Sequence, residues 1–145
     1  ADQKEYERLL KKAYEENVKD SIRFVGRINN DELPVFYSAA DVLVVPSYYE
    51  PFGLVVLEGM ASHTPVVASR KGGLRITIKD GEPGLLFDPH NPLDLKEKIL
   101  QIYRSEGLKN SIIEKAYDNL EKNYSWQKVA KKISDLYELA TQKSK

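Results

Sequence analysis

The residues of this sequence whose types and spacing could do chemistry lie in the segment 47–59, SYYEPFGLVVLEG. It carries two acids, Glu50 and Glu58, with seven residues between them. Pro51 suits the first position of a helix, because an N–H group at that position would have no partner within the helix. Three backbone N–H groups are expected to point outward from the start of this helix: those of Phe52, Gly53 and Leu54. Such groups, with the positive end of a helix dipole, are typical of phosphate sites.

The two acids extend the predicted site beyond a phosphate. With Glu50 before the helix and Glu58 inside it, a rise of about 1.5 Å per residue separates them by about 10–12 Å. One carboxylate could then accept hydrogen bonds from a sugar while the other accepts them from a ribose across a diphosphate. A helical Glu is more often a solvated surface residue, but Glu58 stands among apolar neighbours in LVVLEGMA. A carboxylate in apolar surroundings needs a partner, so we interpret the segment as a sugar-nucleotide site.

Alternating short strands and helices must position these residues. Apolar periodicity and capping residues predict helices over 3–17, 32–40, 53–62, 92–106 (capped by Asn91) and 108–122, with a last helix after Ser125. Short apolar runs predict strands over 22–25, 41–46, 65–69 and 84–87. This order predicts an α/β fold, a Rossmann-like three-layer αβα arrangement with a parallel sheet.

The composition excludes several classes of function. Lys plus Arg equals Asp plus Glu, 22 each, so we expect no nucleic-acid partner. No apolar run approaches the roughly 18–20 residues that span a bilayer, and no signal-peptide pattern is present, so no transmembrane segment is expected. The chain has no Cys and 2 His, which argues against disulfides, thiol nucleophiles and a metal site. The lack of Cys suits a reducing compartment, so we expect a cytoplasmic location, or a peripheral one at the membrane for the full-length protein.

The sequence resembles a known enzyme family over nearly its whole length. The motifs that carry the resemblance are EPFGLVVLE at 50–58, MA at 60–61, TPVVAS at 64–69, GG at 72–73, RFVG at 23–26, GEPGLLF at 81–87 and YSW at 124–126. They are similar to the C-terminal domain of retaining glycosyltransferases of the two-Rossmann-domain (GT-B) type. That group contains glycogen synthases, sucrose-phosphate synthases and bacterial mannosyl- and glucosyltransferases. The acid pair with Phe-Gly inside it is the specific part of the match.

The resemblance implies a role for each matching residue. Glu50 would hold hydroxyl groups of the donor sugar, as a positioning group in the catalytic position rather than a nucleophile. Glu58 would bind the ribose hydroxyls, and Ile28 and Leu33 would border the nucleobase. The backbone groups that would face the sugar and diphosphate are the N–H groups of Phe52, Gly53 and Leu54. Such transferases serve carbohydrate biosynthesis by moving a sugar from a nucleoside diphosphate to an acceptor hydroxyl with retention, without a metal or other cofactor.

The weaker candidates are Arg27, Lys71, Gly72 and Gly73. Lys71 could reach a phosphate and Arg27 lies by the expected base site, but a lone cation in a loop is more often solvated. His63 stands where the family usually has Gly at a helix end, and we expect it to cap the helix in the left-handed conformation rather than to catalyse. Trp126 is interpreted as a core residue or as a brace for the last helix.

The resemblance also predicts how the chain is organised. Residues 1–122 would form a partial donor-binding domain, and 123–145 a C-terminal helix that in the family packs back toward an N-terminal acceptor domain. In the family, that domain, two strands and an Arg/Lys pair precede the point where this chain begins. The sheet would therefore lack its first two strands, between 22–25 and 41–46 in the usual order.

Either another chain or rearranged contacts would complete that sheet, or its strand order differs. The expected partners are the nucleotide-sugar donor and these missing parts of the same enzyme, without which the chain is expected to be inactive. One alternative is a non-catalytic nucleotide-binding or interaction module of the same fold, which the intact acid pair disfavours. Another is a sugar-nucleotide epimerase, which the Phe-Gly between the acids disfavours.

Overall fold

A computed structural model describes residues 3–79 and 81–142 of the chain, which divides into two compact units after Leu33. The smaller unit holds helix α1 (Gln3–Glu15), a short 3-10 turn (Lys19–Ser21) and an irregular segment up to Leu33. The larger unit begins at Pro34 and holds the sheet. Each unit is described by itself below.

The sheet has three parallel strands, β1 (Leu43–Val45), β2 (Val66–Ser69) and β3 (Leu85–Phe87), which lie side by side in chain order. Val44 pairs with Val67, and Ala68 pairs with Leu86. Every residue of the central strand β2 is buried, as expected for a parallel strand whose two faces are both covered. The predicted α/β class with a parallel sheet is confirmed.

Helices cover both faces of this sheet, and they follow the alternation of the strands. The helices of this unit are α2 (Leu33–Ser38, of which Leu33 still counts to the smaller unit), α3 (Leu54–Ala61), α4 (Leu74–Thr77), α5 (Pro92–Arg104), α6 (Glu106–Asn123) and α7 (Trp126–Gln142). Val66, Ala68 and Leu86 pack with Val56 and Met60 of α3 on one face. The strand residues that alternate with these, Val67, Leu85 and Phe87, face the other way and pack with Ile102 of α5 and Ile112 of α6.

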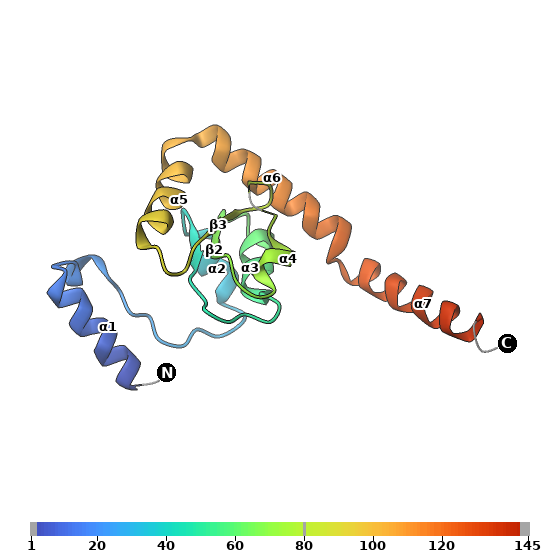
Figure 1. The fold of residues 1–145 in the computed structure, drawn as a ribbon, viewed down its shortest axis with the longest axis horizontal. Coiled ribbons are helices and arrows are strands. Elements are labelled where there is room, and N and C mark those ends of the chain that lie inside the picture. The colour runs from blue at the N-terminus through green and yellow to red at the C-terminus, as the bar shows by residue number, and fades with distance from the viewer. Residues whose placement is uncertain (1–2, 80, 143–145) are drawn as a thin grey trace. The chain divides into compact units, whose positions relative to one another are not determined.

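Helix α6 joins the two cores. It contacts α5 near its start and α3 further along, so that Ala116 belongs to the first core and Ile112 to the second (Figure 1). The predicted caps are visible at α5, where the Asn91 side chain accepts hydrogen bonds from the N–H groups of Leu93 and Asp94. The periodic and capped segments of the sequence thus fold largely as predicted.

One predicted strand is wrong. Residues 22–25 lie outside any strand, and Ile22, Phe24 and Val25 are exposed. Their contacts within the smaller unit are with α1, as in the edge-on pair of the Tyr6 and Phe24 rings at 5.0 Å. A strand persists only where neighbours pair with its N–H and C=O groups, and among the described residues this segment takes part in no ladder.

The C-terminal helix α7 presents its apolar residues to solvent. Ile133, Leu136 and Tyr137 are exposed, and Trp126 is 84% exposed. The interpretation of Trp126 as a core residue is therefore wrong. The predicted boundary at residue 122 falls at the end of α6, whereas the compact units divide after Leu33, and the role of 123–145 as a separate element stays a prediction.

Candidate functional site

The carboxyl ends of the three strands bring the central site residues together. Because the strands are parallel neighbours, the segments after them, 46–53, 70–73 and 88–91, leave the sheet at the same edge. The N–H group of Gly73 donates to the carbonyl oxygen of Glu50 at 2.8 Å, and the Ser69 hydroxyl donates to the carbonyl of Ser47. Ligands of open α/β sheets bind at this edge. Glu50 and the Gly72-Gly73 pair, predicted from separate motifs, therefore belong to one assembly.

Gly72 and Gly73 allow this close approach because they lack side chains. A Cβ atom on Gly73 would lie 2.7 Å from the carbonyl carbon of Pro51 and 2.9 Å from Cα of Phe52, and closer still to the oxygen of Pro51. A Cβ atom on Gly72 would meet the carbonyl oxygen of Glu50, and its φ of +51° also favours glycine. The glycine pair thus holds the acid-bearing turn against the sheet edge.

Gly53 marks the start of helix α3. It has a φ of +89°, and a Cβ atom there would lie 2.7 Å from a methyl carbon of Leu74. Its N–H group donates to Oε1 of Glu50 at 3.1 Å. The expectation of three outward amides is therefore wrong for Gly53, whose amide is capped by the half-buried Glu50 carboxylate. This capping is favourable because a negative charge lies at the positive end of a helix.

Phe52 and Leu54, on either side of Gly53, are exposed. The carbonyl oxygen of Phe52 accepts a hydrogen bond from the Thr77 hydroxyl at 3.0 Å. The Phe52 ring packs edge-on against the Tyr124 ring, with 6.2 Å between the ring centroids. The Thr77 bond fixes the turn from the side of α4. The ligand contacts of these two amides stay predictions.

Glu58 differs from expectation in its surroundings. It is exposed, because α3 turns Val56, Gly59 and Met60 toward the core and leaves Glu58 on the other side. The expectation of a carboxylate among apolar side chains is therefore wrong. Glu58 nevertheless has a partner, since the hydroxyl of Tyr37 donates to its Oε2 at 2.9 Å.

Tyr37 is the residue that the sequence interpretation missed. It lies near the end of α2, 21 positions before Glu58, and its side chain is half-buried. Burial, with the hydrogen bond to Glu58 and the charge of that carboxylate, raises the pKa of Tyr37 to about 12. All three effects act in one direction because the phenolate would be a buried anion beside another anion. The phenol therefore stays neutral and donating at ordinary pH.

The remaining predicted residues belong to the smaller unit or are exposed. Arg27, Ile28 and Leu33 belong to the smaller unit, so their proximity to Glu50 stays a prediction. Lys71 is exposed, beside the Gly72-Gly73 pair.

His63 adopts the expected left-handed conformation at the end of α3, with a φ of +56°. Its ring stacks on Tyr117 of α6 at 4.7 Å. The left-handed φ and the hydrogen bond from the His63 N–H to the carbonyl of Met60 support a helix cap rather than catalysis.

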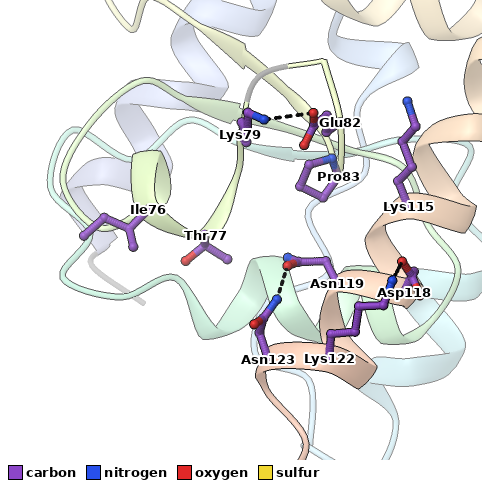
Figure 2. Close-up of a pocket in the computed structure, with 10 residues that line it drawn as sticks. All are labelled: Ile76, Thr77, Lys79, Glu82, Pro83, Lys115, Asp118, Asn119, Lys122 and Asn123. Carbon is purple, nitrogen blue, oxygen red and sulfur yellow. Dashed lines mark hydrogen bonds and ion pairs between the residues drawn. The ribbon is translucent and has the colours of Figure 1, made fainter.

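A hollow between α4, α6 and residues Lys79, Glu82 and Pro83 of the larger unit is lined by other residues (Figure 2). Four of the five charged side chains that line it form two ion pairs, Lys79 with Glu82 and Lys122 with Asp118. In Figure 2 these side chains lie along the walls, and Asn123 donates to Asn119. The hollow thus holds no converging set of unpaired charges that would define a second site.

Residues 3–79 and 81–142 contain neither a metal-binding cluster nor a membrane-spanning helix. No group of three His, Asp or Glu side chains comes together as a metal site would require. No helix in the same residues is long and apolar enough to cross a bilayer.

The sequence model of the family described as glycosyl transferases group 1 matches residues 2–119. This chain belongs to that family. The predicted resemblance to the C-terminal domain of GT-B glycosyltransferases is confirmed. A curated relative, D-inositol 3-phosphate glycosyltransferase of Streptomyces bingchenggensis, is 40% identical over 131 residues, which are 90% of this chain and 29% of the relative.

Solved structures agree with this family assignment. Sucrose-phosphate synthase of Thermosynechococcus elongatus is 37% identical, with a TM-score of 0.86 over 98% of this chain and 36% of the other. A mutant of TarM from S. aureus, in complex with fondaparinux, alpha-GlcNAc-glycerol and UDP, is 27% identical, with a TM-score of 0.78 over 90% of this chain and 26% of the other. This group 1 glycosyltransferase chain spans about a third of the length of the curated relatives that it matches.

Proposed function

We propose that this chain binds the donor of a retaining glycosyltransferase, which moves a sugar from a nucleoside diphosphate to an acceptor hydroxyl. The observation that carries the proposal is the assembly at the carboxyl edge of the sheet. There the Gly72-Gly73 backbone holds the Glu50 turn at the start of α3, with Glu58 further along the same helix. The UDP bound to the TarM mutant supports a nucleotide donor.

The capped amide of Gly53 suggests how the site would accept a diphosphate. In the present structure the Glu50 carboxylate accepts the hydrogen bond of this amide. A bound diphosphate oxygen could take its place, because it is also an anion at the helix start. The Glu50 carboxylate would then turn to the sugar hydroxyls, and one charge-assisted hydrogen bond would replace another. Glu50 would thus accept a hydrogen bond from the Gly53 amide when no donor is bound, and hydrogen bonds from the sugar hydroxyls when the donor is bound.

The other parts of the proposal concern groups further from Glu50. Glu58 would accept hydrogen bonds from the ribose hydroxyls, and Lys71 would approach the diphosphate from its loop. Ile28 and Leu33 would border the base, with Arg27 near it. An N-terminal domain of the complete enzyme would supply the acceptor site. We further propose that transfer proceeds with retention and without a metal, in the cytoplasm.

Donor use by the complete enzyme tests this proposal. Transfer and hydrolysis would be measured with UDP-glucose, ADP-glucose and GDP-mannose for the wild type, Glu50→Ala and Glu58→Ala. We expect one donor to be used, Glu50→Ala to lose most of kcat, and Glu58→Ala mainly to raise the donor KM. Glu97→Ala is the matched control, because Glu97 is an exposed acid on α5, more than one turn beyond the start of that helix. Full activity of both acid variants would refute the proposal.

The Gly53–Glu50 hydrogen bond also favours a second candidate, a nucleotide-binding module of the same fold that transfers no sugar. A permanently capped amide would leave Glu50 a structural residue. In that case the complete protein would bind a nucleoside diphosphate, transfer would be absent with all donors, and Glu50→Ala would reduce stability rather than turnover. The isolated chain is expected to bind nucleotide weakly at most under either candidate.

A further inference from the structure

The hydroxyl of Tyr37 and the carboxylate of Glu58 connect α2 to α3 beside the candidate site, with an oxygen–oxygen distance of 2.9 Å. We propose that Tyr37 is a positioning residue that holds the Glu58 carboxylate in the orientation needed to accept hydrogen bonds from the ribose of the donor. This inference rests on the proposed function and adds a residue to its binding site. Tyr37 itself need not touch the nucleotide.

Two hydrogen bonds to its backbone carbonyl fix the position of Tyr37. Its carbonyl oxygen accepts a hydrogen bond from the hydroxyl of Thr64 at 2.6 Å and one from the N–H group of Ala40 at 3.0 Å. Thr64 is 2% exposed and lies two residues before β2. This part-buried hydrogen bond ties Tyr37 to the segment that leads into the fully buried central strand β2. The phenol is thus a stable reference point for a neighbouring side chain.

Glu58 needs such a reference point because it is exposed. A free Glu side chain on a helix surface samples several rotamers, and ordering it opposes binding. The Tyr37 hydroxyl binds Oε2 only, and a carboxylate can accept about four hydrogen bonds through its two oxygens. Oε1 therefore remains for a ligand hydroxyl. A carboxylate already held in place loses less freedom when the ligand arrives.

The electrostatic setting keeps this hydrogen bond intact. Burial and the neighbouring Glu58 raise the pKa of Tyr37 to about 12, so the phenol donates throughout the range in which enzymes work. A hydrogen bond to a charged acceptor is stronger than one between neutral groups. Glu58 is therefore directed by a donor that keeps its proton throughout that range.

The test uses the binding of nucleoside diphosphates with and without the ribose 2′-hydroxyl. Calorimetry on the complete enzyme would compare UDP, ADP and GDP with their 2′-deoxy forms for the wild type, Tyr37→Phe, Glu58→Gln and the double variant. Tyr37→Phe keeps the ring and removes only the hydroxyl. Tyr117→Phe is the matched control, because Tyr117 is an exposed tyrosine on α6 whose ring stacks on His63.

We expect Tyr37→Phe to weaken the preferred ribonucleotide by about 3- to 10-fold, the range of one net hydrogen bond. The affinity for the 2′-deoxy form should fall much less, so that the ratio of ribonucleotide to deoxyribonucleotide affinity decreases. With sugar donor as substrate, KM should rise while kcat stays near the wild-type value. The double variant should bind like Glu58→Gln, because Tyr37 acts through Glu58. Tyr117→Phe should leave all of these values unchanged.

Other outcomes overturn the inference, and they separate it from the proposed function. An equal loss of ribo and deoxy binding in Tyr37→Phe, or a loss of melting temperature alone, would make Tyr37 a structural brace. Tighter ribonucleotide binding would show that the phenol competes with the ribose. If Glu58→Gln loses ribose discrimination and Tyr37→Phe keeps it, only the Tyr37 inference fails. If the wild type binds none of the diphosphates, or Glu58→Gln keeps full discrimination, the proposed ribose role of Glu58 fails and the inference fails with it.

Discussion

Replacing Gly73 by Ala isolates the packing between the Gly72-Gly73 loop and the Glu50 turn. The φ of Gly73 is −65°, an ordinary helical value, so an Ala at this position carries no backbone strain. Its methyl group, however, would lie 2.7 Å from the carbonyl carbon of Pro51, where ordinary contact begins at 3.4 Å. All three nearest atoms are backbone atoms of Pro51 and Phe52, so no flexible side chain can move aside. The two loops must separate.

Two effects lower the free energy of unfolding in Gly73→Ala. Overpacking of a filled site costs about 1–3 kcal/mol. Separation of the loops also breaks the hydrogen bond from the Gly73 N–H to the Glu50 carbonyl, with a net loss of about 1 kcal/mol. We therefore expect the free energy of unfolding to fall by about 2–4 kcal/mol, a large share of the about 5–15 kcal/mol typical of a domain. With a urea slope near 2 kcal/mol per molar, the unfolding midpoint should move down by about 1–2 M.

Urea unfolding of this chain, followed by far-UV circular dichroism, measures this shift. Gly107→Ala is the control for the substitution itself: a Cβ atom there meets nothing within 4 Å, and we expect a gain of up to about 0.5 kcal/mol. Gly81→Ala is the control for strain, because its φ is +84° and its surroundings are also open. In the complete enzyme, Gly73→Ala should raise the donor KM, since the Glu50 turn moves. A Gly73→Ala midpoint equal to that of Gly107→Ala would refute the packing argument.

Three other substitutions test particular features of the fold. Asn91→Ala removes the acceptor of two first-turn N–H groups of α5 and should lower the free energy of unfolding by about 1 kcal/mol, whereas Asn91→Asp should lose little in the same urea measurement. His63→Gly should be about 1 kcal/mol more stable than His63→Ala, because both lose the ring stack but only Ala keeps a strained left-handed residue; equal midpoints would contradict this reason. The raised pKa of Tyr37 favours the neutral phenol in the folded state, so the stability that it adds is present below pH 10 and is lost as the pH rises toward 12. The difference in melting temperature between the wild type and Tyr37→Phe should shrink over that window, and a constant difference would exclude the titration of Tyr37.

Local sequence signals predicted the elements whose stability is local. The Asn91-Pro92 cap, the apolar runs of β1, β2 and β3 and the periodicity of α1 all reappear in the structure. The acid-bearing turn and the Gly72-Gly73 pair were also found from sequence. Their contact was not, because it depends on which strands are neighbours. The register of β1 against β2 brings Gly73 to the carbonyl of Glu50, and no spacing within one motif contains that information.

The segment 22–25 shows the limit of composition as a guide to strands. Arg-Phe-Val-Gly at 23–26 has residue types as suited to a strand as those of β3, yet only Leu85–Phe87 forms one. The difference is pairing, since β3 lies beside β2 and the described residues offer 22–25 no ladder. Strand formation is a property of a pair of segments. A strand prediction made from one segment therefore also assumes a neighbouring segment that pairs with it.

Glu58 shows the same limit for a side chain. Its neighbours in sequence are apolar, but helical geometry places residues four apart on the same side and residues two apart on opposite sides. Glu58 accordingly shares its exposed side with Leu54, and the buried Val56 lies on the other. The inference that Glu58 needs a partner assumed apolar surroundings that this residue does not have, and the partner in the structure, Tyr37, comes from another helix. A tyrosine 21 positions away could be connected to this acid only once α2 and α3 were placed together in space.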